Sequence, residues 1–162
     1  MTLVYHKITN FEWGGTWVTP HQFESQMHYL YQNGYKTINL SESFYHQLSF
    51  AEGNFSTINH QLLVTFDDGY ENIYTYAYLL LRKYGFNAII FIIAGYIGKE
   101  NLWDVNVGFK RFKHLNWEQI KEMQRAGFVF GSHTVTHPDL TKIPINKAKE
   151  EIEISKKIKI RK

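Results

Sequence analysis

The segment QLLVTFDDGY, residues 61–70, decides how this chain is expected to fold. After Gln61 it is apolar or β-branched up to Phe66, which is typical of a strand buried in a parallel sheet. Asp67 and Asp68 end that strand, and Gly69 permits a turn that lets both carboxylates face one site. The simpler alternative is that one aspartate caps the following helix.

Helix and strand signals alternate on both sides of this segment, which predicts an α/β domain with a parallel sheet spanning residues 1–162. The predicted strands are 2–6, 36–40, 61–66, 86–94 and 128–131. The predicted helices are 19–34, 41–50, 70–84 and 116–126, with a last helix from 146 onward. A closed (β/α) barrel needs more strands and typically about 250 residues. We therefore expect a sheet left open at its last strand, or a chain shorter than the natural domain.

A second polar motif, SHTVTHPDL at residues 132–140, follows the last predicted strand. His133 and His137 are four residues apart, a spacing that brings two side chains together on one turn or in a tight loop. Pro138 makes a longer helix unfavourable here, so a loop or a single turn is expected. The motif is not that of the zinc proteases, since Thr134 stands where their glutamate would be. Histidines with this spacing are also common without any metal.

Together the two motifs supply two imidazoles and two adjacent carboxylates at strand ends, where a (β/α) barrel places its active site. Two imidazoles and one carboxylate make a three-ligand site for zinc that leaves a position open for water. Cobalt, nickel or iron could substitute. The second carboxylate is then free to act as a base, which completes the requirements for metal-assisted hydrolysis.

Bulk properties exclude several other classes of protein. The 162 residues are 44% hydrophobic and include no cysteine, so neither disulfides nor thiolate metal sites are expected. Much of the net charge of +3 lies in the last few residues, and no basic stripe predicts a nucleic-acid partner. We expect neither an export signal near the N-terminus nor a membrane span, and localisation stays open.

The residues TFDDGY (65–70) and SHTVTHPDL (132–140) resemble the first two motifs of the polysaccharide deacetylase family, also called the NodB-homology family or carbohydrate esterase family four. Segments around 5–8, 23–35, 103–104 and 115–119 are similar to this family as well. The resemblance implies a distorted (β/α) barrel. It also implies that Asp67 is the catalytic base and that Asp68, His133 and His137 bind a divalent metal, most simply zinc.

The implied activity is removal of N-acetyl groups from an amino-sugar polysaccharide or peptidoglycan, and members of the family often work at the cell envelope. His6 and Trp103 are candidate substrate contacts, His6 at the end of the first strand and Trp103 in a long loop. The resemblance leaves the substrate polymer, the native metal and the oligomeric state open.

The chain departs from the family after His137, because the later motifs and the histidine that serves as general acid have no counterpart there. We therefore expect a barrel that is incomplete at its C-terminal side. The alternative function is a catalytically silent remnant that binds metal or carbohydrate. A metallophosphoesterase is less favoured, since no glycine-rich or basic phosphate cradle accompanies the candidate ligands.

Overall fold

A computed structural model describes residues 1–12, 15–38, 60–101 and 111–158. Its strands are β1 (Thr2–Tyr5), β2 (Lys7–Ile8), β3 (Trp17–Val18), β4 (Lys36–Thr37), β5 (Gln61–Phe66), β6 (Ile89–Ile92) and β7 (Val129–Ser132). Its α-helices are α1 (Pro20–Gln32), α3 (Leu79–Lys83), α4 (Trp117–Arg125) and α5 (Ile145–Lys157). A π-helix covers Ile73–Tyr78, and a 3-10 turn covers Ala94–Tyr96.

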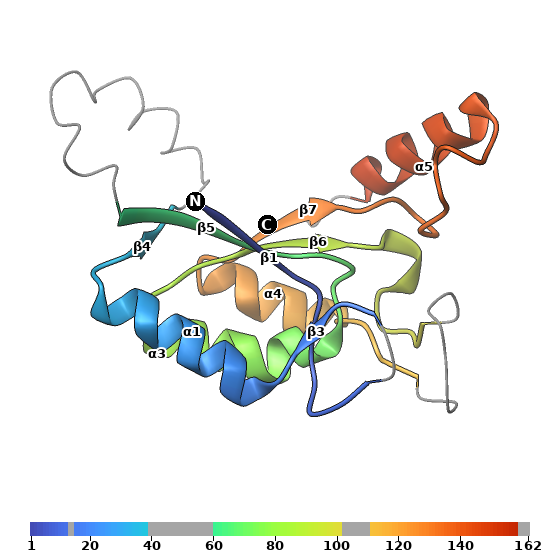
Figure 1. The fold of residues 1–162 in the computed structure, drawn as a ribbon. Coiled ribbons are helices and arrows are strands. Elements are labelled where there is room, and N and C mark those ends of the chain that lie inside the picture. The colour runs from blue at the N-terminus through green and yellow to red at the C-terminus, as the bar shows by residue number, and fades with distance from the viewer. Residues whose placement is uncertain (13–14, 39–59, 102–110, 159–162) are drawn as a thin grey trace, which may run out of the picture.

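The central sheet is parallel, as the alternation of helix and strand signals predicts. Its strands run in the order β1-β5-β6-β7, and β4 pairs with the first residues of β5. β5, which carries the segment at 61–66, therefore lies inside the sheet, between β1 and β6. Strands β2 and β3 form a separate parallel pair beside it (Figure 1). Because the strands of the central sheet all run parallel, their carboxyl ends lie along one edge of that sheet.

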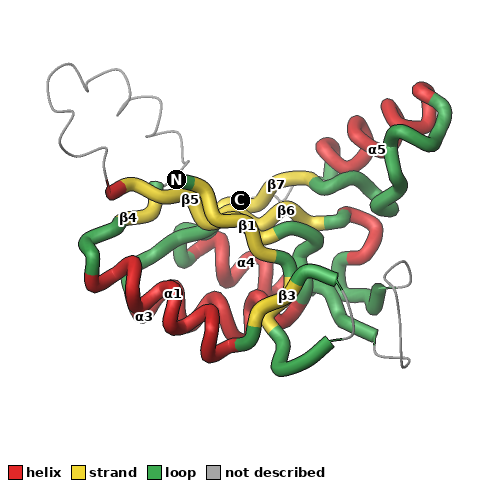
Figure 2. Tube along the Cα trace, in the orientation of Figure 1, coloured by secondary structure: helices red, strands yellow, loops and turns green. Residues whose placement is uncertain are grey.

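The hydrophobic core lies between the sheet and the helices α1, α3 and α4, which cover one of its sides (Figures 1 and 2). Phe66 from β5 contacts Phe23 from α1, with ring centroids 5.8 Å apart. Both side chains are fully buried, as is Ile120 from α4. Burying a large apolar side chain contributes about 1.5–3 kcal/mol. This packing therefore holds the strand that ends at Asp67 and Asp68.

The helices predicted to begin at Thr19 and Asn116 are confirmed, and both of these residues are N-caps. Thr19 and Gln22 form a reciprocal capping box at the start of α1, in which the backbone amide of Gln22 donates to Thr19 Oγ1 over 3.1 Å. Asn116 and Gln119 do the same before α4. These contacts join residues three apart in sequence, so the local sequence pattern predicts them without knowledge of the fold.

Some predicted elements differ in extent from the observed ones. Strands predicted at 36–40 and 86–94 are shorter in the structure, and the helix predicted at 41–50 lies outside the described residues. The helix predicted at 70–84 divides into the π-helix and α3. Because a π-turn aligns residues five apart, Ile73 is buried together with Tyr78 as well as Ala77.

The last helix, α5, stands away from the helices that cover the core (Figure 1). It follows β7, which ends the order of strands in the described sheet. Ile145 is 87% exposed and Ile152 is 51% exposed, so much of the apolar surface of α5 faces solvent. In the described part of the chain the sheet is therefore open at β7.

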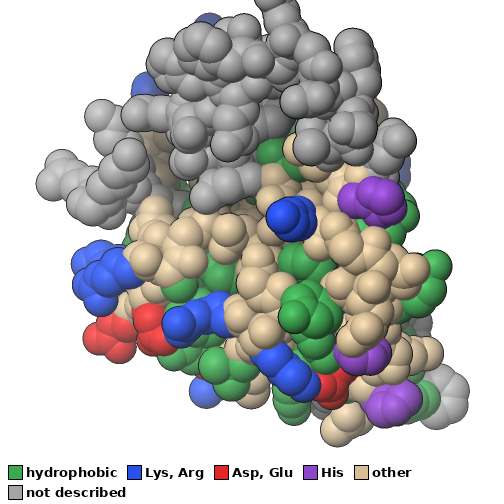
Figure 3. Space-filling model, turned by 90° about the vertical axis from the view of Figure 1, so that its left-hand side faces the viewer, with side chains coloured by type: hydrophobic (Ala, Val, Ile, Leu, Met, Phe, Trp, Pro, Cys, Tyr) green, Lys and Arg blue, Asp and Glu red, His purple; other side chains and the backbone are tan. Residues whose placement is uncertain are grey.

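The surface of the described residues carries charges of both signs. Figure 3 shows a face on which basic and acidic groups lie near one another, with apolar side chains exposed between them. Lys83 and Glu24 form one mixed pair, with Nζ 2.9 Å from Oε1. None of the helices in this part of the chain combines the length and the apolar character that a membrane crossing needs.

Candidate metal centre

Asp67 and Asp68 lie where β5 ends and the chain turns. The Asp67 amide donates to the carbonyl oxygen of Tyr5 over 2.9 Å, which extends the β1–β5 ladder up to the turn. Asp68 then takes a left-handed backbone conformation with φ of 69°, which aspartate tolerates better than most residues. Gly69 continues the turn with φ of 71°, and a Cβ there would lie 2.7 Å from Ile92 Cγ2. The turn therefore requires the glycine.

His133 and His137 come from a loop that begins as β7 ends, as predicted from Pro138. The His133 amide donates to the carbonyl oxygen of Ile92 over 2.9 Å, which ties the start of the loop to β6. The His137 amide donates to Thr134 Oγ1 over 3.0 Å, which closes the loop on itself. Thr134 and His137 both have left-handed backbones, with φ of 66° and 61°. This tight turn brings the two imidazoles to the same side.

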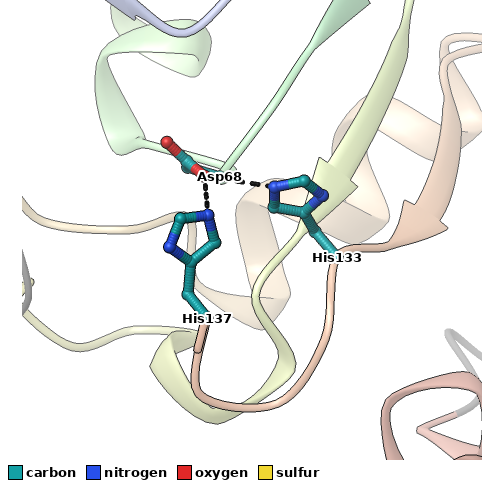
Figure 4. Close-up of side chains that lie close together, drawn as sticks. All are labelled: Asp68, His133 and His137. Carbon is teal, nitrogen blue, oxygen red and sulfur yellow. Dashed lines mark ion pairs between the residues drawn. The ribbon is translucent and has the colours of Figure 1, made fainter. Parts of the chain in front are cut away.

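The fold brings three of the predicted side chains together (Figure 4). Asp68 Oδ1 lies 3.5 Å from His133 Nε2 and 3.4 Å from His137 Nε2. One potential ligand atom from each of the three residues lies within 4.8 Å of the others. Asp68 is buried, whereas each histidine side chain is 34% exposed, so the cluster is reachable from solvent on the imidazole side.

This donor set fits a divalent metal on two independent grounds. Ligands about 2.0–2.1 Å from a tetrahedral zinc lie about 3.3–3.4 Å from one another, close to the separations found here. In addition, Asp68 Oδ1 is buried and accepts no hydrogen bond within the described residues. A buried carboxylate oxygen without a donor is costly, and a cation at this place would supply the missing partner.

Within the cluster, burial and neighbouring charges act mainly on the Asp68 carboxyl. Burial raises the pKa of the Asp68 carboxyl, and the negative charge of Asp67 raises it further. His6, His133 and Lys7 oppose this effect but do not cancel it. The carboxylate is therefore held in its charged form less firmly than an exposed aspartate, and a bound cation would reverse this balance.

Asp67 and the candidate substrate contact His6 lie beside the cluster. His6 Nε2 is 3.8 Å from Asp67 Oδ2, and the two side chains are 29% and 23% exposed. The second carboxylate thus remains accessible while Asp68 is enclosed. Trp103, the other candidate substrate contact, lies outside the described residues.

Lys7 lies next to His6, and the sequence motifs give no indication of its surroundings. Its side chain is 3% exposed and forms an ion pair with Glu12, with Nζ 2.6 Å from Oε1. The ammonium also lies 5.1 Å from the ring centroid of Tyr70 and 4.9 Å from that of Phe112. Pairing with a carboxylate and two aromatic faces compensates its burial. A lysine in a short strand offers no local sign of such an environment.

Comparisons with known proteins agree with the fold and with the motifs. The sequence profile described as polysaccharide deacetylase matches residues 56–160. YxkH of Bacillus subtilis (strain 168) is 34% identical over 157 residues, which cover 96% of this chain. The poly-β-1,6-N-acetyl-D-glucosamine N-deacetylase of Staphylococcus aureus (strain MRSA252) is 34% identical over 126 residues, or 77% of this chain. The chain therefore belongs to the polysaccharide deacetylase family.

A solved structure gives the same result at the level of the fold. The Streptococcus pyogenes deacetylase PplD in complex with acetate superposes with a TM-score of 0.73 and 28% sequence identity, covering 96% of this chain. The predicted α/β fold of the deacetylase type is thereby confirmed. The chain spans 50% of the length of YxkH, 39% of the staphylococcal enzyme and 65% of PplD.

Proposed function

We propose that this protein is a metal-dependent hydrolase that removes N-acetyl groups from an amino-sugar polymer. The observation that carries the proposal is the enclosed Asp68 carboxylate, which faces two imidazole nitrogens at 3.4 and 3.5 Å while accepting no hydrogen bond in the described part of the chain. In the proposal Asp68, His133 and His137 hold a divalent metal, with zinc as the first candidate. When bound, such a metal supplies Lewis acidity that activates water and polarises a carbonyl group.

Asp67 is the general base in this proposal. Its carboxylate is partly exposed and adjoins the cluster, so it can accept the proton of the attacking water at an Oδ atom without leaving its place on the turn. His6 lies next to Asp67 and would contact the substrate at the mouth of the site. The leaving amine needs a proton at the end of the reaction, and none of Asp67, Asp68, His133 and His137 is assigned to that step.

The substrate class rests on the relatives. The staphylococcal relative is named for poly-β-1,6-N-acetyl-D-glucosamine, and PplD was solved with acetate, the product expected of N-deacetylation. We infer that an N-acetylated amino-sugar polymer is also the substrate here, which would suit work at the cell envelope. We further propose that residues 1–162 form one deacetylase-like domain, because β1 near the N-terminus pairs with β5 and the core draws on α1, α3 and α4.

The direct test is acetate release from N-acetylglucosamine oligomers by the zinc-loaded chain. Asp67→Asn should retain zinc binding and lose about 10²–10⁴ in rate, the usual contribution of a general base. Glu153→Gln is the control, because Glu153 carries an exposed carboxylate that pairs with Lys149 on α5. Release that is insensitive to Asp67→Asn would refute the proposed role of Asp67. A chain that binds zinc but releases no acetate would favour the silent metal- or carbohydrate-binding remnant.

A further inference from the structure

The loop between the two candidate histidine ligands has a backbone that cannot hold its shape unaided. Thr134 and His137 have φ of 66° and 61°, although neither residue is glycine. A β-branched residue such as threonine is rare in this region of backbone conformation. Such residues cost about 1–3 kcal/mol each and persist only where surrounding contacts impose them. The contacts that impose this shape therefore also determine where His137 points.

Glu151, from α5, makes the contacts in the middle of this loop. Its Oε2 accepts hydrogen bonds from the amides of Val135 and Thr136 over 2.7 and 2.9 Å. Its Oε1 accepts a third from Thr136 Oγ1 over 2.7 Å. One carboxylate thus binds both backbone amides between the strained Thr134 and His137. Hydrogen bonds to a charged acceptor are about twice as strong as neutral ones.

The opposite side of the loop is bound by the chain that follows β6. The amides of Ala94 and Gly95 donate to the carbonyl oxygens of Thr134 and Val135 over 3.0 and 2.9 Å. These bonds fix the carbonyl groups of the loop but leave its amides to Glu151. The loop is therefore held between the segment that follows β6 and a single side chain of α5.

A second side chain of α5 fixes the helix relative to β7. Ser132 Oγ donates to Ser155 Oγ over 2.6 Å, and Ser155 is 3% exposed. Ser155 lies one helical turn after Glu151, so both side chains project from the same face of α5. The helix thus has two polar attachments, one at the end of β7 and one in the middle of the loop.

Side-chain packing between α5 and the loop leaves a gap. A cleft of about 310 Å³ lies between the loop and α5, and Val135, Thr136, Glu151 and Ile154 are among the residues that line it. Ile154 is 48% exposed. Because the interface is not close-packed, the position of the loop depends on the directional hydrogen bonds of Glu151 more than on side-chain contact.

We propose that Glu151 is a positioning residue for the metal centre, holding the loop at 134–136 so that His133 and His137 present their Nε2 atoms to Asp68. This inference rests on the proposed function, because it assumes that the three residues bind a metal. Through Glu151, helix α5 would support the site by contacting the loop and not the ligand cluster itself. The distance in sequence between Glu151 and the loop explains why the motifs alone do not reveal the contact.

The experiment measures zinc affinity by competition with a chromophoric chelator, together with the d–d absorption of the Co²⁺-loaded chain. Glu151→Ala should lower zinc affinity about 10–100-fold, the usual effect of losing a group that orients a ligand. It should also alter the Co²⁺ spectrum and accelerate hydrogen exchange at the amides of Val135 and Thr136. Glu151→Gln should restore most of the affinity, because its amide oxygen can still accept from both backbone amides. Glu153→Gln is the control, since Glu153 is an exposed glutamate of the same helix.

Wild-type zinc affinity and an unchanged Co²⁺ spectrum in folded Glu151→Ala would overturn the inference. If that variant does not fold, Glu151→Asp takes its place, because a side chain one methylene shorter keeps the charge but cannot reach both amides. Wild-type affinity in Glu151→Asp would overturn the inference equally. A wild-type chain without zinc affinity would instead refute the proposed function, and the metal role of Glu151 with it.

Discussion

The substitution Asp68→Asn should separate the stability of the metal-free fold from its affinity for metal. Asparagine keeps the shape of the side chain and removes its charge. In the metal-free chain that charge is enclosed next to Asp67, and Oδ1 accepts no hydrogen bond within the described residues. An unpaired buried polar group costs about 1–3 kcal/mol, and a charged group costs more than a neutral amide in the same place. We therefore expect Asp68→Asn to raise the metal-free unfolding free energy by about 1 kcal/mol at neutral pH.

Zinc should reverse this order of stability. At a free zinc concentration of about 100 times Kd, binding adds about 2.7 kcal/mol to the unfolding free energy of the wild-type chain. Asp68→Asn should lose most of that increment, because an amide oxygen is a much weaker zinc ligand than a carboxylate. The wild-type chain is then the less stable of the two in chelator and the more stable in zinc.

Urea unfolding followed by tryptophan fluorescence, in chelator and in zinc, measures both quantities. Glu153→Gln is the control for loss of a carboxylate charge, since Glu153 is exposed on α5. Because burial raises the pKa of Asp68, the advantage of Asp68→Asn in chelator should be present at neutral pH. It should disappear as the pH falls and the wild-type carboxyl becomes protonated. An equal zinc increment in both chains would refute the ligand role of Asp68, and a less stable metal-free variant would refute the argument from burial.

Three further outcomes are expected. Zinc affinity should fall as the pH is lowered, starting above the usual aspartate range, because burial raises the pKa of Asp68 and protons then compete with zinc for its carboxylate. A flat affinity profile from neutral to mildly acidic pH would contradict this. Gly95→Ala should lower zinc affinity about 10-fold or more although every candidate ligand is intact. The reason is that the new Cβ would lie 2.5 Å from the carbonyl oxygen of Val135 and would displace the loop. Chelator competition on the folded variant measures this affinity. Thr19→Ala should lower the unfolding free energy by about 0.5–2 kcal/mol through loss of the α1 cap. Its zinc affinity should stay unchanged, and a changed affinity would show that the α1 cap and the metal site are coupled.

The sequence alone was sufficient for features that depend on neighbours along the chain. The capping boxes at Thr19 and Asn116 join residues three apart, so local pattern identifies them. The strand at 61–66 is recognisable because after Gln61 it is largely buried on both faces, and its residues there are apolar or β-branched. The placement of Asp68, His133 and His137 at the carboxyl ends of parallel strands followed from the same patterns, and the structure places the three side chains together. Their role in binding metal stays a prediction.

Tertiary structure decided the features whose partners are distant in sequence. The loop with the left-handed residues Thr134 and His137 donates amide hydrogen bonds to Glu151 in α5 and accepts others from the segment after β6. The burial of Lys7 depends on two aromatic rings that the fold brings over it. A periodic sequence pattern cannot predict such contacts, because the partners lie in different elements and only the packing of those elements sets the distance between them. Local sequence patterns are enough to indicate which groups could form the site, whereas the contacts around those groups come from elements that only the packed fold brings together.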